Sequence, residues 1–140
     1  MSKNHPILIV EDDVDDQDIL KEVFHSLEIP NELKFFNRCP DLLDYLRTTT
    51  DRPLIILTDV NLPVMSGIEL RMEICKDEYL RRKSIPFVFL TTSNSIQAIE
   101  KAYDLNVQGY FIKEDNFNAI KSMIRQIIDY WVVCKHPNII

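Results

Sequence analysis

The chain has 140 residues, of which 46% are hydrophobic and 27% are charged. This balance predicts one soluble globular domain and excludes both a disordered chain and a membrane-spanning protein. With 22 acidic against 16 basic residues, the net charge is −6, which argues against direct binding to nucleic acid because that needs a basic surface.

Apolar runs alternate with amphipathic segments from the start of the chain. Residues 7–10 are apolar without polar alternation, which is typical of a strand covered on both faces. Apolar side chains at 19–27 recur at helical spacing, and Pro30 ends that helix. A strand is expected at 33–36, and Asp41 is the expected N-cap of the helix that follows it.

The middle of the chain repeats this order. An uninterrupted apolar run at 54–57 predicts another buried strand. A helix is expected over 68–74, after which the polar stretch 76–84 brings the chain back to the surface. Residues 87–90 predict a fourth strand with both faces covered.

The last third contains two more helices around a short strand. Apolar residues at helical spacing predict a helix over 96–103, and 109–112 predict a fifth strand. The final helix, over 117–131, has the clearest apolar stripe, and Asp115 or Asn116 is available to cap its start.

Five strands that alternate with helices imply a parallel sheet, because parallel neighbours need crossover connections that cover both faces. The predicted fold class is therefore α/β, a doubly wound five-stranded parallel sheet with helices on both faces. One domain accounts for residues 1–140, with a core of about 5–131 and a short tail at 135–140.

The cysteines and the N-terminus carry no targeting or metal signal. The three cysteines are odd in number and have no CxxC spacing, so neither a disulfide framework nor a zinc site is expected. The first apolar run is too short for a signal peptide or a membrane span. We therefore expect a cytoplasmic protein with no membrane partner.

Polar residues follow the predicted strands at the edge where open α/β sheets bind ligands. Residues that share this position are Glu11, Asp12, Asp13, Asp59, Asn61, Thr91 and Lys113. Crowded carboxylates repel one another unless a cation neutralises them, and oxygen ligands without His or Cys favour Mg²⁺. Mg²⁺ commonly completes its shell with phosphate, which Lys113 and Thr91 can also contact. Asp59 is then the candidate nucleophile that forms an aspartyl phosphate.

Other interpretations of the acids remain open. Asp15, Asp16 and Asp18 also fit a solvated helix start, since acids favour the first turn of a helix. A calcium loop fits poorly, because Val14 and Gln17 interrupt the alternation of ligands.

Four short motifs stand in order at the strand ends: Glu11-Asp12-Asp13, Leu57 to Pro63 with Gly67, Leu90-Thr91-Thr92, and Gly109 to Lys113. Together they resemble the bacterial response-regulator receiver domains, and the length is similar to that of the small regulators serving phytochrome-type and hybrid histidine kinases. The resemblance implies a flavodoxin-like sheet of strand order 2-1-3-4-5. It also implies a two-component phosphorelay switch, not an enzyme, whose phosphoryl donor is a sensor histidine kinase or a histidine phosphotransfer protein.

The resemblance implies a role for each acid in the site. Asp59 matches the phosphoacceptor and a metal ligand. Asp13 matches the direct Mg²⁺ ligand, and Asp12 matches its neighbour that acts mainly through water. Asn61 matches the residue that offers a backbone carbonyl to the metal.

The same resemblance implies how the switch works. Thr91 matches the hydroxyl that moves toward the phosphoryl group, Tyr110 the aromatic ring that turns inward, and Lys113 the partner of the phosphorylated aspartate. These movements repack the surface formed by the helix at 96–103, the strand at 109–112 and the last helix. Glu114 stands where the family commonly has a proline after a cis bond, so the conformation of the Lys113–Glu114 bond is open.

Two other functions and one assembly remain as alternatives. A degenerate receiver would act as a phosphorylation-independent binding module. A phosphatase of the haloacid-dehalogenase type also uses a strand-end aspartate, but Asn61 stands where its general acid would be. The sequence leaves a homodimer open.

Overall fold

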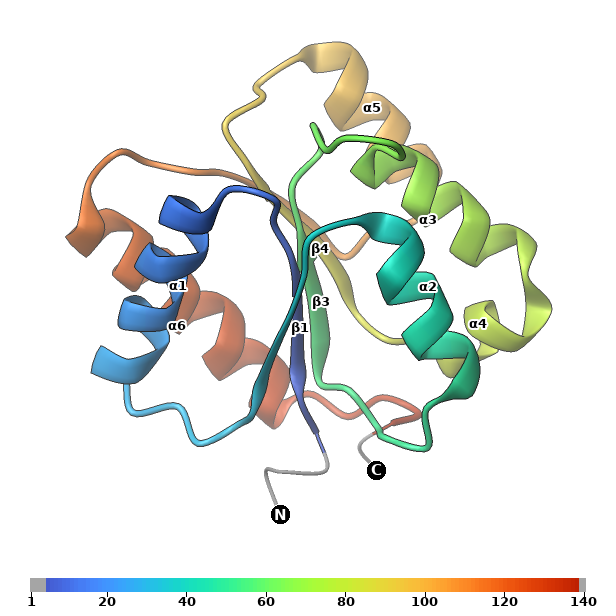
Figure 1. Ribbon diagram of the computed structural model, residues 1–140, viewed down its shortest axis with the longest axis horizontal. Helices are drawn as coiled ribbons and strands as arrows, with labels where there is room; N and C mark the ends of the chain where they lie inside the picture. The colour runs from blue at the N-terminus through green and yellow to red at the C-terminus, as the bar shows by residue number, and fades with distance from the viewer. Residues whose placement is uncertain (1–4, 139–140) are drawn as a thin grey trace.

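The computed structural model describes residues 5–138 and has three layers, with a central sheet between two layers of helices (Figure 1). The five strands run in the order β2-β1-β3-β4-β5, and each neighbouring pair is parallel. Their bounds are Ile7–Val10 for β1, Leu33–Phe36 for β2, Ile55–Thr58 for β3, Phe87–Thr91 for β4 and Gly109–Ile112 for β5. The predicted fold class and strand order are confirmed.

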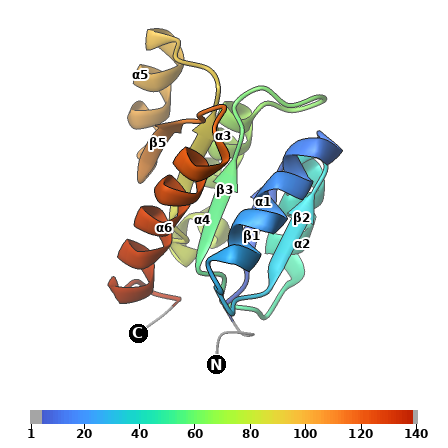
Figure 2. The ribbon, with the colours of Figure 1, turned by 90° about the vertical axis from the view of Figure 1, so that its left-hand side faces the viewer.

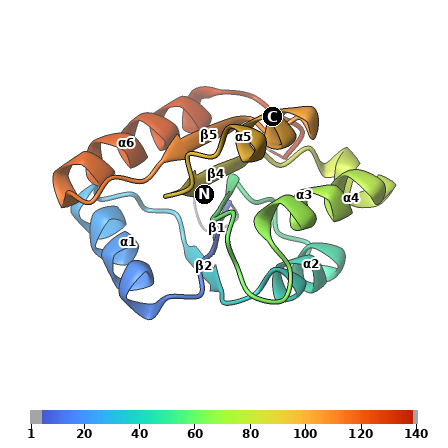
Figure 3. The ribbon, with the colours of Figure 1, turned by 90° about the horizontal axis from the view of Figure 1, so that it is seen from above.

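Six helices are described, and most of them lie on the two faces of the sheet. Their bounds are Val14–Ser26 for α1, Cys39–Thr48 for α2, Gly67–Lys76 for α3, Glu78–Lys83 for α4, Ile96–Asp104 for α5 and Phe117–Val133 for α6. Seen from above, α1 and α6 lie on one side of the sheet, and α2, α3 and α4 lie on the other (Figure 3).

Both faces of the sheet are buried, which explains the continuous apolar runs. In β1, Leu8 and Val10 pack into the core under α2 and α3, whereas Ile7 and Ile9 pack into the core under α1 and α6. Successive strand side chains point to opposite faces, so a strand covered twice needs apolar residues at every position.

The start of α2 differs from the prediction that Asp41 is its N-cap, which was wrong. The helix begins at Cys39, Arg38 is the N-cap residue without a side-chain capping bond, and Pro40 lies in the first turn. Proline has a backbone angle that suits the first turn of a helix, so the helix starts before Asp41.

Helix α4 lies within the polar stretch 76–84 and was not predicted. The Asp77 side chain accepts a hydrogen bond from the Leu80 backbone N–H at 3.2 Å and caps this helix. Leu80 is its buried residue, at 3% exposure. One buried residue in six produces no periodic pattern, so the sequence contains no signal for this helix.

Helix α5 has its predicted position but buries little of its apolar surface. Ala102 is its buried residue, whereas Ile96 and Tyr103 are 70% and 50% exposed. The helical spacing of the apolar residues therefore identifies this helix without showing which of those side chains the core buries. Figure 2 shows α5 at the upper end of the molecule, and the end of α6 near the start of β1 at the opposite end.

Within residues 5–138, no helix is long and apolar enough to cross a membrane.

Candidate functional site

The candidate site lies where the carboxyl ends of β1, β3, β4 and β5 meet. In the sheet register, Val10 is level with Thr58, so the next residues, Glu11 and Asp59, leave neighbouring strands side by side. On the other side of β3, the Lys113 backbone N–H donates to the Thr91 carbonyl at 2.7 Å. Parallel pairing therefore brings together residues from four separate parts of the sequence.

Asp59 is a half-buried carboxylate immediately after β3. Its Oδ1 accepts a hydrogen bond from the Thr91 hydroxyl at 2.6 Å and another from the Asn61 backbone N–H at 3.2 Å. Thr91 is fully buried, so its hydroxyl is held in place beside this carboxylate.

Gly67 packs directly against the backbone of Asp59. A Cβ at this position would lie 2.1 Å from the Asp59 carbonyl oxygen and 2.7 Å from the Phe89 ring. The Gly67 N–H donates to the Val60 carbonyl at 2.9 Å, and Ser66 caps the helix that begins here. The loop after β3 can therefore fold this tightly only with glycine at position 67.

Lys113 contacts two carboxylates, and neither belongs to Asp59. Its Nζ lies 3.3 Å from Glu11 Oε1 and 3.8 Å from Asp16 Oδ2. The side chains of Lys113 and Glu11 are 10% and 5% exposed, so this is a buried ion pair. Burial raises the pKa of Glu11, although the positive charge of Lys113 acts in the opposite direction.

Glu11 is a site residue to which sequence analysis assigned no individual role. It lines the same small cleft as Asp59 and Lys113. Its position was available as a signal, because Glu11 directly follows the last residue of β1 just as Asp59 follows the last residue of β3. The aspartates that follow it, Asp12 and Asp13, match the family's metal ligands and mask this signal.

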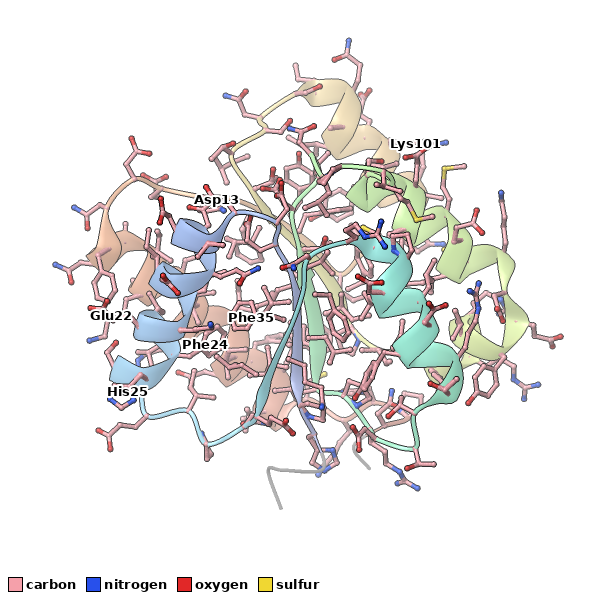
Figure 4. The ribbon with its side chains drawn as sticks, viewed as in Figure 1. Asp13, Glu22, Phe24, His25, Phe35 and Lys101 are labelled. Atoms are coloured by element: carbon pink, nitrogen blue, oxygen red, sulfur yellow. The ribbon has the colours of Figure 1, made fainter. Side chains whose placement is uncertain are left out.

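Asp12 and Asp13 are exposed. Asp13 lies at the start of α1 (Figure 4) and is its N-cap residue. Its Oδ1 accepts from the Asp15 N–H at 3.0 Å. Among residues 5–138, no three His, Cys, Asp or Glu side chains are grouped so as to hold a metal ion. The donor types nevertheless fit a hard divalent cation, since Asp12, Asp13, Asp59 and Asn61 offer oxygen atoms.

A hydrogen-bonded path leads from Asp59 to the outer strand β5. Thr91 Oγ1 accepts from the Ser93 N–H at 3.2 Å, and the Ser93 carbonyl accepts from the Tyr110 hydroxyl at 2.8 Å. The half-buried Tyr110 ring packs on Phe89, with centroids 5.6 Å apart. Tyr110 and Asp59 are thus linked through Thr91 and the loop that precedes α5.

The backbone after Lys113 is ordinary. No peptide bond among the described residues is cis, so the Lys113–Glu114 bond is trans. Asn116 caps α6 by accepting from the Ala119 N–H at 3.1 Å, which decides between the two predicted caps.

Comparison with known proteins gives matches over nearly the whole chain. A family model described as the response regulator receiver domain matches residues 7–125. The response regulator Rcp1 of Synechocystis sp. is 32% identical over 131 residues, which cover 90% of this chain and 88% of Rcp1. The probable methanogenesis regulatory protein FilR2 of Methanothrix harundinacea is also 32% identical, over 90% of this chain and 83% of its own length.

Solved structures agree in fold. The phosphorylated cyanobacterial phytochrome response regulator RcpA has a TM-score of 0.83 at 31% identity, covering 94% of this chain and 96% of that one. The Mn²⁺-bound form of Rcp1 has a TM-score of 0.81 at 31% identity, with 94% and 97% covered.

Proposed function

The chain belongs to the response regulator receiver domain family, and on that basis we propose that Asp59 is the residue on which it accepts a phosphoryl group. The family comprises signalling switches of phosphorelays. The donor is a sensor histidine kinase or a histidine phosphotransfer protein. The observation that carries the assignment is the half-buried Asp59 carboxylate at the end of β3, 2.6 Å from the buried Thr91 hydroxyl.

The chemistry follows from the two oxygens of Asp59. Both of its carboxylate hydrogen bonds within the described residues go to Oδ1, so Oδ2 is the oxygen available to attack phosphorus. The new P–O bond forms as the P–N bond to the donor histidine breaks, and the histidine nitrogen leaves with the electron pair. Thr91 then donates its hydroxyl proton in a hydrogen bond to a phosphoryl oxygen.

The oxygen ligands at this site would hold a divalent cation, which we propose to be Mg²⁺ and which would supply positive charge to offset the negative charge of the transfer. Asp12, Asp13 and Asp59 would supply carboxylates, and Asn61 would supply its backbone carbonyl. Asp12 and Asp13 are exposed, so their side chains are free to turn, and Asp13 would give up its bond to the Asp15 N–H. The Mn²⁺-bound structure of the similar Rcp1 supports a divalent metal here.

The switch would begin with Lys113 and Thr91. A phosphoryl group adds charge and acceptor oxygens, which draw the Lys113 ammonium away from Glu11 and Asp16. Movement of the Thr91 hydroxyl breaks its bond from the Ser93 N–H and disturbs the Tyr110 contact with the same loop. The change therefore reaches the surface formed by α5, β5 and α6.

The test is phosphorylation by a small acyl-phosphate donor with and without Mg²⁺, read by intact mass. Wild type with Mg²⁺ should gain one phosphoryl group, and Asp59→Asn should gain none. Asp18→Asn, which removes an exposed acid on α1, should behave as wild type. If Asp59→Asn were labelled, a residue other than Asp59 would be the phosphoacceptor. If folded wild type were not labelled, the result would favour a phosphorylation-independent binding module.

A further inference from the structure

A cationic cavity lies at the amino-terminal edge of the sheet, at the opposite end from Asp59. It has a volume of about 340 Å³, within the range of about 300–1,000 Å³ that small-molecule sites occupy. Two of its lining residues, Ile85 and Gln108, lie just before strands: Ile85 is two residues before the start of β4, and Gln108 directly precedes β5. Its remaining walls come mainly from α3 and α4, so we call it the α3–α4 cavity.

The lining combines positive charge with an apolar floor. Three cationic side chains line it, Arg71 from α3 and both Arg81 and Lys83 from α4, and none of the lining residues is acidic. Its aliphatic side chains are Leu46, Ile56, Ile74, Leu80 and Ile85. This concentration of positive charge occurs in a chain whose net charge is −6.

These three cations have no carboxylate partner within residues 5–138, whereas nearby basic residues do. Arg82, the neighbour of Arg81 on α4, pairs with Glu78 at 3.8 Å and does not line the cavity. Lys83 instead places its ammonium over the Tyr79 ring, 4.7 Å from the centroid. The cavity therefore holds positive charge that the described protein does not neutralise.

Arg71 is partly buried. Its Nε and Nη2 donate to the backbone carbonyls of Leu105 and Asn106, both at 2.9 Å, and its guanidinium lies 5.3 Å from the Phe87 ring centroid. These partners are neutral, and burial lowers the pKa of Arg71. Partial burial of a cation without an anion is unfavourable, so a nearby anion would be stabilised here.

A simpler interpretation is that Arg71 only fastens the C-terminal end of α5, where carbonyl groups carry partial negative charge. That interpretation accounts for the two Arg71 N–H groups that donate to the carbonyls of Leu105 and Asn106. It leaves unexplained why Arg81 and Lys83 line the same cavity without an acid. It also does not explain why polar Ser84 and Asn106 occupy left-handed positions on its wall, with φ of 52° and 61°, where glycine is the usual residue.

We propose that the α3–α4 cavity binds a small organic anion that presents a phosphate group to Arg71, Arg81 and Lys83 and an apolar part to the aliphatic floor. The side chains of Asn106 and Gln108, which also line the cavity, carry amide N–H groups that can donate further hydrogen bonds. Because Arg71 also holds the end of α5, an anion bound beside it would bias the position of α5. Binding of the anion would thus be a second signal, besides phosphorylation, that acts on the protein from the end of the sheet opposite Asp59.

The test is calorimetric titration of the full chain with phenyl phosphate and with adenosine 5′-monophosphate, in EDTA so that the Asp59 site takes no metal. Both anions should bind saturably, and phenol and adenosine, which lack phosphate, should not. Arg81→Gln and Lys83→Gln should each weaken binding by about tenfold, the usual effect of losing one charge-assisted hydrogen bond. Arg82→Gln removes the same charge from the same helix and should leave affinity within about twofold of wild type.

Two results would overturn the proposal. One is the absence of saturable binding of either phosphate at millimolar concentration. The other is equal weakening by Arg81→Gln and Arg82→Gln, which would mean that the anions respond only to net charge. Amide chemical shifts provide an independent check: the largest changes should fall at Ile85 and Gln108, and changes centred on Asp59 would contradict the assignment.

Discussion

Lys113 and Glu11 are 102 positions apart in the sequence and form a buried ion pair. Removing one partner leaves the other charge buried, so Lys113→Met should lower the free energy of unfolding at pH 7 by about 3 kcal/mol. Burial raises the pKa of Glu11, which means that its charge is itself costly in the folded state, so Glu11→Gln should cost less. Urea unfolding of the single and double variants measures both effects.

The double variant is the informative control. If the two side chains act as a pair, Glu11→Gln combined with Lys113→Met should destabilise the protein by less than the sum of the single changes. A strictly additive result would show that Lys113 is stabilised by Asp16 or by packing, and not by Glu11.

Gly67 and Gly109 allow a matched comparison at the residue scale. Gly67→Ala would place a Cβ 2.1 Å from the Asp59 carbonyl oxygen, which cannot move without shifting the loop after β3. At Gly109 the nearest atom, 3.0 Å away, is the end of the Phe111 side chain, which can move. Overpacking costs about 1–3 kcal/mol, so Gly67→Ala should lower the unfolding free energy by at least that amount, and Gly109→Ala by less.

The same two variants should differ in phosphorylation. Gly67→Ala displaces the backbone that carries Asp59 and should slow labelling by acyl phosphate, whereas Gly109→Ala should label at the rate of wild type. Equal rates in the two variants would show that the close approach of Gly67 does not position Asp59.

At the scale of elements, α5 and α6 differ in how firmly they are held. Helix α6 buries Ile120, Ile124, Ile127 and Ile128, whereas α5 buries Ala102 and exposes most of its remaining surface. Segments with few buried apolar contacts open locally at low free-energy cost. We expect the backbone amides of α5 to exchange with solvent at least about tenfold faster than those in the middle of α6.

Hydrogen exchange followed by NMR measures this difference residue by residue. The strands β1 and β3, which are buried on both faces, serve as the slow reference. Equal protection of α5 and α6 would mean that the loop contacts around Ser93 and Arg71 hold α5 more firmly than its burial indicates. The comparison therefore tests whether α5 is the element with the freedom to move.

The helices also show when a capping residue in the sequence predicts the start of a helix. Asn116 and Asp77 each cap the helix that follows through a side-chain hydrogen bond, but only the first precedes a periodic apolar stripe and was predicted. Asp41 has the right residue type for a cap and lies instead in the first turn of α2. A capping residue is informative when an amphipathic pattern follows it, because packing of that pattern stabilises most helices.

At the scale of the whole molecule, His136 contributes to holding the C-terminal segment against the body. Its ring packs edge-on against Trp131 with centroids 6.1 Å apart, and both ring nitrogens are buried without a hydrogen-bond partner within the described residues. The Asn138 side chain donates to the Lys83 carbonyl at the end of α4. Burial lowers the pKa of His136 below its ordinary value of 6.5, and the nearby charge of His5 acts in the same direction.

A lowered histidine pKa means that the folded protein takes up this proton less readily than the unfolded chain. The neutral His136 ring therefore makes its full contribution to the free energy of unfolding above pH 6.5. That contribution is lost as pH falls through 6.5 toward the pKa of His136 in the folded protein. His136→Phe keeps an aromatic ring beside Trp131 and removes the titration. Relative to this variant, wild type should lose unfolding free energy between pH 7 and pH 5, as measured by urea unfolding.

Replacing His25, an exposed histidine on α1, supplies the control. His25→Gln should follow the wild-type pH dependence, because His25 is exposed and its replacement leaves His136 and its contacts unchanged. If His136→Phe also followed wild type, protonation of His136 would not be linked to folding.

The amino-acid sequence by itself determined the strands, their order along the chain and the edge at which the site forms. Continuous apolar runs such as residues 54–57 identify strands buried on both faces, and the acids and hydroxyl directly after them, Asp59 and Thr91 among them, must then meet at one edge of a parallel sheet. These signals are local, so they need no knowledge of the rest of the fold.

Only the tertiary structure decided which partner each charged side chain takes. No local pattern in the sequence pairs Lys113 with Glu11 or Asp16, and sheet register together with burial brings these side chains together. The exposure of Ile96, and the grouping of Arg71 with Arg81 into one cavity, depend in the same way on how helices pack. Such contacts are set by competition among side chains brought together from distant parts of the chain, and no local pattern records the outcome.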